Sequence, residues 1–291
     1  MTLSEAQPLR IERVDDVRDP RLADYRCLTD VTLRLRAEPA NGLFIAESAL
    51  VIERAVRAGY PLRSVLVGEP LLATVSTLLP AGTIVYVGDA PLLREVTGFH
   101  VHRGALASVA RLAPRSVDDV VSSATRIAIL EDVNTHTNVG SIFRCVAALG
   151  VDAVLLTPSC TDPLYRRSVR VSMGAVFTVP YARFETWPQP LEALRDKGFR
   201  LLALTPDAGL ALHELRLEPG ERAALLLGAE GPGLTPAALA YAEAVGIPMS
   251  AGIDSLNVAA AAAIACYAFA DRDNSGASQR SPSANAGRQT P

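Results

Sequence analysis

The stretch Leu225–Tyr267 places the tightest limits on how this chain can fold. It begins with an apolar run that leads into three closely spaced glycines, Gly228, Gly231 and Gly233. Glycines at the end of a strand let the backbone adopt positive φ and come close to a ligand. A second apolar segment ends at Pro248, which stiffens another loop. The pattern therefore predicts two ligand-facing loops packed side by side.

The second loop is followed by a helix whose start is marked by polar residues. Ser255 stands just before Leu256, Asn257 and an alanine-rich run. A serine at such a place commonly caps a helix, because its hydroxyl accepts a hydrogen bond from a free backbone N–H of the first turn. We therefore expect Ser255 to be the N-cap of the last helix.

Apolar runs and amphipathic segments alternate along most of the chain, which is typical of an α/β protein. In the N-terminal third, helices are expected over residues 22–35, 48–58, 70–79 and 90–97. Strands are expected over residues 43–47, 65–67, 83–87 and 105–110. Such an alternating unit closes on itself as a small domain.

The C-terminal half predicts a parallel sheet covered by helices on both faces. Strands are expected over residues 126–130, 153–156, 175–179, 201–204, 223–227 and 246–247. A helix with Asn138 as its N-cap joins the first two strands into a parallel βαβ unit. The expected parts are a flexible arm (1–20), a small α/β domain (21–112), a linker (113–124), a larger α/β domain (125–270) and a disordered tail (271–291).

Composition restricts the kind of protein. A chain of 291 residues, 49% of them hydrophobic, can bury one large core or two modest ones. Its longest charge-free apolar run, residues 258–270, is too short to cross a membrane, which takes about 20 residues. The N-terminus lacks the pattern of a secretory signal, so we expect a cytoplasmic enzyme. The cysteines argue against zinc, iron–sulfur or disulfide frameworks because they are widely separated, at Cys27, Cys145, Cys160 and Cys266.

Charge and glycine spacing narrow the ligand class. The net charge is −3, so any contact with nucleic acid must come from a local basic patch. A dinucleotide-binding loop needs G-x-G-x-x-G after the first strand of its domain, whereas the glycines here follow a late strand with the spacing G-x-x-G-x-G. The only lysine is Lys197, so a phosphate-binding Walker lysine is absent. Dinucleotide binding and nucleotide hydrolysis are therefore disfavoured.

Three motifs, in this order, resemble those of the SpoU/TrmH family of SPOUT RNA methyltransferases. They are Asn138-x-Gly140-Ser141-Ile142-x-Arg144, then Leu227-Gly228-x-Glu230-Gly231-x-Gly233, then Ile247-Pro248-Met249 followed by Ser255-Leu256-Asn257-Val258. The match covers about residues 126–268. The stretch from Phe44-Ile45-Ala46-Glu47 to His102-Arg103-Gly104-Ala105-Leu106-Ala107 resembles the ribosomal-protein-L30e-like substrate-binding domain that often precedes the family's catalytic domain, and this resemblance spans most of residues 20–110.

The resemblance implies a fold and an activity. The fold would be a small L30e-like α/β domain followed by a parallel-sheet SPOUT domain whose C-terminal chain forms a trefoil knot, which composition could not suggest. The activity would be methyl transfer from S-adenosylmethionine, without a metal, to a ribose 2′-hydroxyl of RNA, carried out by a homodimer. An L30e-like domain suits structured RNA, which favours ribosomal over transfer RNA. Neither DNA nor a membrane is expected as a partner.

The resemblance also assigns candidate site residues, motif by motif. Those at the methyl-transfer site would be Asn138, Arg144, Glu230, Ser255 and Asn257. Those at the cofactor would be Thr205, Leu227, Gly228, Gly231, Ile247, Met249, Leu256 and Val258. Homodimerisation is further expected because Arg144 and the loop 162–172 would otherwise lack a partner wall.

The expected reaction sets modest demands on these side chains. A sulfonium methyl group is already activated, so an enzyme mainly has to align a poorly acidic hydroxyl with it and stabilise the alkoxide. A guanidinium group essentially does not deprotonate in proteins. We therefore expect Arg144 to bind a flanking phosphate and stabilise negative charge, with Glu230 orienting neighbouring groups. The sequence leaves the general base undefined.

Each candidate also has a structural alternative. In this alternative, Asn138, Ser255 and Glu230 serve only as helix caps, and Arg144 is a solvent-exposed residue of its helix. The cluster of Arg166, Arg167 and Arg170 is either an RNA contact or an ordinary charged surface. These alternatives leave the order of the three motifs unexplained. A transfer-RNA methyltransferase, a non-catalytic RNA-binding protein of the same fold and a cofactor sensor remain open as functions.

Overall fold

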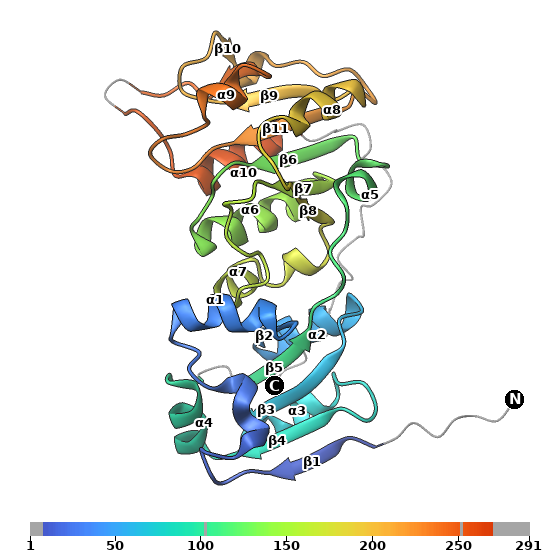
Figure 1. Cartoon of the computed structure of the whole chain (residues 1–291), viewed down its shortest axis with the longest axis vertical. Coiled ribbons are helices and arrows are strands. Elements are labelled where there is room, and N and C mark those ends of the chain that lie inside the picture. Colours follow the sequence, from blue (N-terminus) through green and yellow to red (C-terminus); the bar gives the residue numbers. More distant parts are fainter. Residues whose placement is uncertain (1–7, 102–103, 251–252, 270–291) are drawn as a thin grey trace, which may run out of the picture.

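The computed structural model describes residues 8–101, 104–250 and 253–269, which form two sheets arranged one after the other along the molecule (Figure 1). The expected tail, residues 271–291, and residues 1–7 of the expected arm lie outside this described part. No helix within it is long and apolar enough to cross a membrane.

The first sheet is built from the N-terminal third of the chain. Its strands are β1 (Arg10–Arg13), β2 (Leu43–Glu47), β3 (Leu62–Gly68), β4 (Ile84–Gly88) and β5 (Ala105–Ala110). They lie in the order β1-β4-β3-β5-β2, with β5 antiparallel to both of its neighbours. Its helices are η1 (Pro20–Tyr25), α1 (Val31–Ala40), α2 (Ala49–Arg57), η2 (Glu69–Leu71), α3 (Leu72–Ser76) and α4 (Ala90–Thr97).

Three expectations for this third of the chain need correction. Part of the expected arm, β1, pairs with β4 as an edge strand. The helix expected over 22–35 is divided in two, because the Asp30 carboxylate accepts a hydrogen bond from the N–H of Leu33 at 2.9 Å and starts a new helix there. That helix runs on to Ala40 with Pro39 inside its last turn. The resemblance to an L30e-like domain stays a prediction.

The second sheet is built from the rest of the chain. Its strands are β6 (Arg126–Leu130), β7 (Ala153–Leu156), β8 (Tyr181–Arg183), β9 (Arg200–Leu204), β10 (Leu210–Ala211), β11 (Ala223–Leu227) and β12 (Glu243–Gly246). They lie in the order β10-β12-β9-β11-β6-β7-β8. Every pairing in this sheet is parallel within the described residues, which confirms the predicted parallel sheet.

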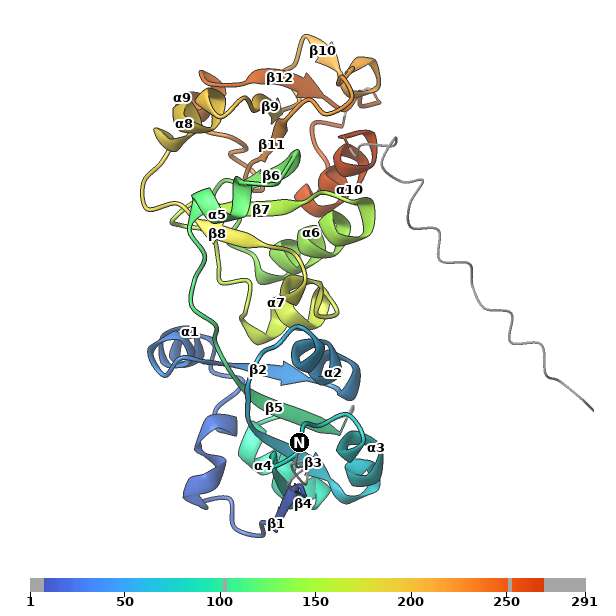
Figure 2. The same ribbon diagram turned by 90° about the vertical axis from the view of Figure 1, so that its right-hand side faces the viewer.

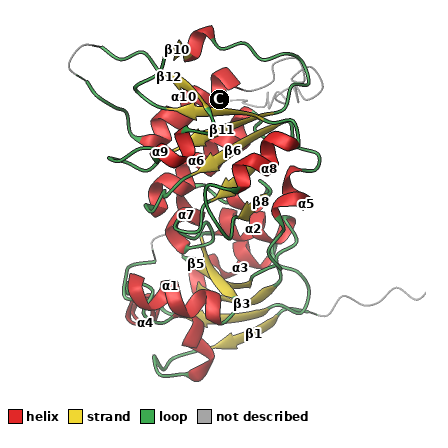
Figure 3. Ribbon diagram, turned by 45° about the horizontal axis from the view of Figure 1, so that its top comes forward, coloured by secondary structure: helices red, strands yellow, loops and turns green. Residues whose placement is uncertain are grey.

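Helices cover both faces of the second sheet (Figure 3). They are α5 (Val117–Val121), α6 (His136–Leu149), α7 (Arg166–Val171), η3 (Ala175–Phe177), α8 (Pro190–Asp196), η4 (Leu212–Glu214), α9 (Pro236–Leu239) and α10 (Val258–Phe269). Because successive side chains of a strand point to opposite faces, Ala128 and Leu130 pack in the core with α6 and α10. Ile127 and Ile129 pack in the core with α5, α8 and α9. This double burial explains the continuous apolar strands of the sequence.

Two expected strands and the linker differ in the structure. Residues 175–179 are not a strand, because Gly174 adopts φ +79° and starts the 3-10 turn η3. The strand comes later, as β8 after Pro180. The strand expected at 246–247 is β12, which ends at Gly246. Within the expected linker, α5 buries Val120 and Val121 against the second sheet.

The segment around α7 and η3 lies between the two sheets (Figures 1 and 2). The ring of Phe177 packs against Phe44 and Tyr60, with centroids 5.5 and 5.2 Å apart. Arg166 pairs with the buried Glu47 at 2.8 Å. One hydrophobic core therefore runs from the first sheet into the second. The loop 162–172 thus has a wall within its own chain, which removes one of the two reasons given for a homodimer.

Candidate functional site

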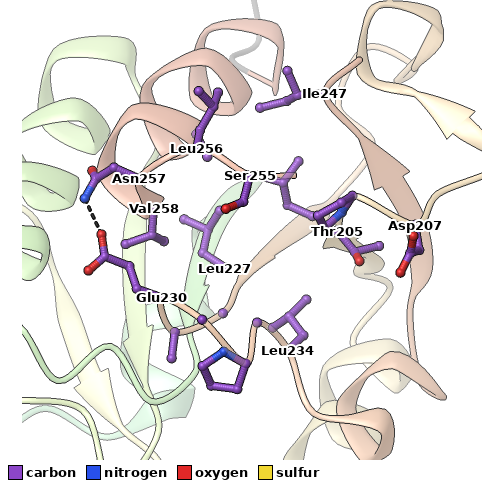
Figure 4. Close-up of a pocket in the computed structure, with 18 of the residues that line it drawn as sticks. Thr205, Asp207, Leu227, Glu230, Leu234, Ile247, Ser255, Leu256, Asn257 and Val258 are labelled. Atoms are coloured by element: carbon purple, nitrogen blue, oxygen red, sulfur yellow. Dashed lines mark hydrogen bonds between the residues drawn. The ribbon is translucent and has the colours of Figure 1, made fainter. Parts of the chain in front are cut away.

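A pocket of about 620 Å³ opens at the carboxyl ends of β9, β11 and β12 (Figure 4). This is where ligands bind in open parallel sheets, because the strand ends leave a crevice between diverging loops. The candidate residues that line it are Thr205, Leu227, Gly228, Glu230, Gly231, Ile247, Met249, Ser255, Leu256, Asn257 and Val258. Eleven of the thirteen candidates are thus brought together, and their chemical roles stay predictions.

The glycine-rich loop after β11 forms one wall of the pocket. A side chain at Gly228 would place its Cβ atom 2.3 Å from the carbonyl carbon of Gly233 and 2.4 Å from the nitrogen of Leu234. The loop can fold back this closely only because Gly228 has no Cβ. Gly231 and Gly233 have φ values of +90° and +69°, which L side chains rarely adopt. The sequence prediction of a tight backbone loop at this place is confirmed.

The opposite wall comes from the segment after β12 and the start of α10. Ile247, Met249, Leu256 and Val258 supply apolar surface there. Ser255 does not cap α10, which corrects the prediction from the sequence. Asn257 takes this role instead, because its side-chain oxygen accepts hydrogen bonds from the N–H groups of Ala259 and Ala260 at 2.9 and 3.3 Å.

Three polar side chains from three separate motifs meet beside the pocket. The amide of Asn257 donates to Oδ1 of Asn138 at 3.2 Å. It also donates to Oε1 of Glu230, as the dashed line in Figure 4 marks. The same residue therefore caps α10 and ties the glycine-rich loop to α6. Asn138 is not the N-cap of α6, as the sequence suggested, because α6 begins at His136 and Asn138 lies inside its first turn.

Arg144 lies away from this junction within a single chain. It is exposed on α6 and does not line the pocket. Within the described residues it makes no hydrogen bond or ion pair, so its guanidinium group is available to a ligand or to another chain. It borders a separate groove beside α2.

Two carboxylates mark opposite ends of the pocket (Figure 4). One is the candidate Glu230, and the other is Asp207, which sequence reasoning missed. Asp207 follows β9 by three residues, so an acidic residue just past a buried strand was the available signal. Both side chains are exposed. A ligand in this pocket thus meets negative charge at both ends and apolar surface between them.

Glu131 is a second residue that the sequence analysis missed. It follows β6 directly and is 1% exposed. Its carboxylate accepts hydrogen bonds from the N–H and the hydroxyl of Thr235, at 3.0 and 2.7 Å, and from the indole N–H of Trp187. Thr235 in turn caps α9 and ends the glycine-rich loop. Glu131 therefore holds the outer end of the loop that forms the pocket wall.

Replacing Glu131 by alanine should lower the free energy of unfolding by about 1–3 kcal/mol, because two donors of Thr235 and one of Trp187 lose the buried carboxylate that accepts their hydrogen bonds. Weaker ligand binding in the pocket should accompany this loss, since the loop end is released. Chemical denaturation and ligand titration measure the two effects. Glu185→Ala, which removes an exposed carboxylate without a partner among the described residues, is the control. Equal stability of both variants would remove the positioning role of Glu131.

The part of the chain that the structure describes has no recognisable metal-binding site. No group of three or more His, Cys, Asp or Glu side chains there is arranged to hold a metal ion. The buried cysteines have no role in the pocket, and burial raises the pKa of the Cys266 thiol to about 12. The polar side chains that line the pocket are two carboxylates, two hydroxyls, of Thr205 and Ser255, and the amide of Asn257.

The fold and the pocket together define an α/β protein with a pocket between backbone loops at the carboxyl ends of a parallel sheet. Residues 125–267 match the model of the SpoU rRNA Methylase family. An uncharacterized tRNA/rRNA methyltransferase of Mycobacterium tuberculosis, Rv0881, is 46% identical over 263 residues, which are 89% of this chain and 91% of that protein. The chain belongs to the SpoU rRNA methylase family.

Solved structures show the same fold across most of the chain. An rRNA methyltransferase from Sinorhizobium meliloti with AdoMet bound has a TM-score of 0.76 at 22% identity and covers 89% of this chain and 97% of its own. A structure described as an RNA 2′-O ribose methyltransferase has a TM-score of 0.73 at 26% identity and covers 89% of this chain and 98% of its own. Both likenesses extend well beyond the matched methylase segment.

Proposed function

We propose that this protein transfers a methyl group from S-adenosylmethionine to a ribose 2′-hydroxyl of RNA, with ribosomal RNA as the substrate. The observation that carries the proposal is the junction of Asn138, Glu230 and Asn257 beside the pocket. These residues come from three motifs that are far apart in the sequence. A junction of polar side chains beside a ligand pocket is what alignment of a hydroxyl with a bound methyl donor requires.

The pocket suits S-adenosylmethionine by size and by charge. Its volume of about 620 Å³ lies in the range of small-molecule sites. The apolar surface of Leu227, Ile247 and Leu256 fits an adenine ring, whose edge can bond to free backbone groups of the loops. Glu230 and Asp207 offer negative charge to a ligand that carries a sulfonium and an ammonium group. S-adenosylmethionine supplies the activated methyl group, so no metal is needed.

The side chains around the pocket would then act on the RNA. Asn257 holds the carboxylate of Glu230 in place, and this carboxylate would accept the 2′-hydroxyl proton or orient a group that does. Arg144 would stabilise the alkoxide charge and bind the flanking phosphate, because a guanidinium group offers a rigid fork of donors. Ser255 would contribute a further donor at the pocket wall.

A homodimer and a trefoil knot form part of the proposal. Within one chain the pocket lacks Arg144, so a second copy is needed to present it unless the RNA itself reaches both places. The exposed Ile264 and Tyr267 of α10, which packs on α6, offer apolar surface for such a contact. An RNA substrate also supports a cytoplasmic location.

The experiment combines binding, transfer and mapping. Calorimetry with S-adenosylmethionine should give saturable binding at one site per chain. Tritium-labelled methyl groups should then pass to unmodified ribosomal RNA and not to transfer RNA. The labelled nucleotide should resist alkaline hydrolysis on its 3′ side, because a 2′-O-methyl group blocks attack on the adjacent phosphate. Alkaline cleavage next to the labelled nucleotide would indicate methylation of a base. Label in transfer RNA would indicate the alternative substrate. Cofactor binding without methyl transfer would indicate a non-catalytic protein.

A further inference from the structure

A second groove lies between the two halves of the chain, away from the pocket. It has a volume of about 600 Å³ and separates α2 from α6 and η3. The residues lining it are Arg54, Arg57, Ala58, Arg144, Ala147, Ala148, Ser172, Met173, Gly174, Ala175 and Thr178. Three arginines from two parts of the chain thus border one groove, and no carboxylate is among its lining residues.

The three guanidinium groups are exposed, and only that of Arg57 has a carboxylate partner within the described residues. Nη1 of Arg54 donates to the carbonyl oxygen of Met173, which fixes this side chain across the groove without cancelling its charge. Arg57 is 77% exposed and reaches Glu53 only at 3.4 Å, a surface pair that contributes little. Arg144 makes no ion pair within the described residues. A positive groove therefore stands out on a chain whose net charge is −3.

The floor of the groove is made of small residues. A Cβ atom at Gly174 would lie 3.3 Å from Cβ of Arg54, so the glycine lets α2 approach this segment closely. Ala147 and Ala148 are exposed beside Arg144 and leave the groove open. There is no aromatic side chain among the lining residues on which a base could stack. The groove thus suits a charged backbone better than a base.

We propose that this groove binds the phosphodiester backbone of the RNA next to the nucleotide that is methylated. Arg54 and Arg57 would each bind a phosphate, and the strand would pass from α2 toward Arg144. This inference rests on the proposed function, since it assigns a path to the substrate of that reaction. Helix α2 then contributes to substrate binding, although it packs against the first sheet and lies outside the three motifs.

Salt dependence of RNA binding tests the groove. The probe is unmodified ribosomal RNA made by transcription in vitro, titrated by filter binding at several salt concentrations. For Arg54→Gln combined with Arg57→Gln, the slope of log K against log salt should fall by about 1.4–1.8, because each lost phosphate contact removes about 0.7–0.9. The dissociation constant should rise about tenfold or more, whereas calorimetric binding of S-adenosylmethionine should stay unchanged.

Two further variants separate the loss of an RNA contact from other effects. Arg57→Glu leaves the contact of Arg54 with Met173 intact, so its effect cannot come from loosening the two halves of the chain. Arg94→Gln removes an exposed arginine of α4 that has no partner within the described residues, and it should bind RNA as the unchanged protein does. Unchanged RNA affinity and salt dependence in Arg57→Glu and in the double variant would overturn the proposal that the groove binds RNA. Normal RNA binding by the groove without methyl transfer would instead contradict the proposed function alone.

Discussion

Replacing Gly228 by alanine is expected to weaken the binding of S-adenosylmethionine about 100-fold. The added methyl group would lie 2.3–2.5 Å from the backbone of Gly233 and Leu234, and backbone cannot rotate away as a side chain can. The loop must therefore shift, at a cost of about 1–3 kcal/mol, and its wall of the pocket moves with it. We expect an affinity loss of about 100-fold and no detectable methyl transfer, measured by calorimetry and tritium incorporation.

Gly209 provides the matched control for this substitution. It follows β9 by five residues and stands before β10, and a Cβ atom there would meet nothing within 4 Å. Its φ lies outside the left-handed region, so Gly209→Ala should bind the methyl donor normally. Similar thermal midpoints for the two variants would show that the domain survives both changes. Retained cofactor affinity in Gly228→Ala would mean that the loop does not form the binding wall.

The sequence carried enough information to locate the pocket loops, because their signals are local. Glycines after an apolar strand dictate a tight return whatever surrounds them, and Leu227 and Gly228 lie where that reasoning placed them. Parallel strands buried on both faces leave a continuous apolar pattern, so the second sheet was also accessible. The short β10 had no such pattern and was not anticipated.

Features that depend on distant contacts could not be read in this way. Glu131 meets Trp187 and Thr235, and no local pattern reports that meeting. Ser255 and Asn257 are both good caps, and only the backbone decides which one faces the free N–H groups of α10. Residues 175–179 have strand-forming side chains, but the positive φ of Gly174 overrides that preference.

The roles of Arg166, Arg167 and Arg170 could be assigned only from the structure. Arg166 and Arg170 both reach the buried carboxylate of Glu47, at 2.8 and 3.6 Å. They join α7 to β2 and thereby fix the first sheet against the second. Arg167 is exposed and has no partner among the described residues. A cluster that suggested either RNA contact or plain surface thus contains two residues with a structural task.

Replacing Arg144 by alanine should lower the rate constant of methyl transfer by about 10²–10³-fold, because a donor that stabilises the alkoxide is lost. Binding of S-adenosylmethionine should be unaffected, since Arg144 does not line the pocket. Arg144→Lys should recover little of this rate, because an ammonium group cannot form the bidentate contact of a guanidinium group. Rates under saturating donor, compared with calorimetric affinities, separate the two effects. Near-full methylation by the lysine variant would contradict a bidentate role for the guanidinium group of Arg144.

Mixing two inactive variants then decides whether Arg144 acts within its own chain. A dimer of one Arg144→Ala chain and one Glu230→Ala chain has one site with both groups intact if Arg144 reaches the partner's pocket. If each chain is self-sufficient, both sites in that dimer are defective. Because Arg144 lies outside the pocket of its own chain, we expect activity to return on mixing after the subunits have exchanged. A mixture as inactive as its parents, with exchange demonstrated by native mass spectrometry, would place Arg144 and Glu230 at the same site of one chain.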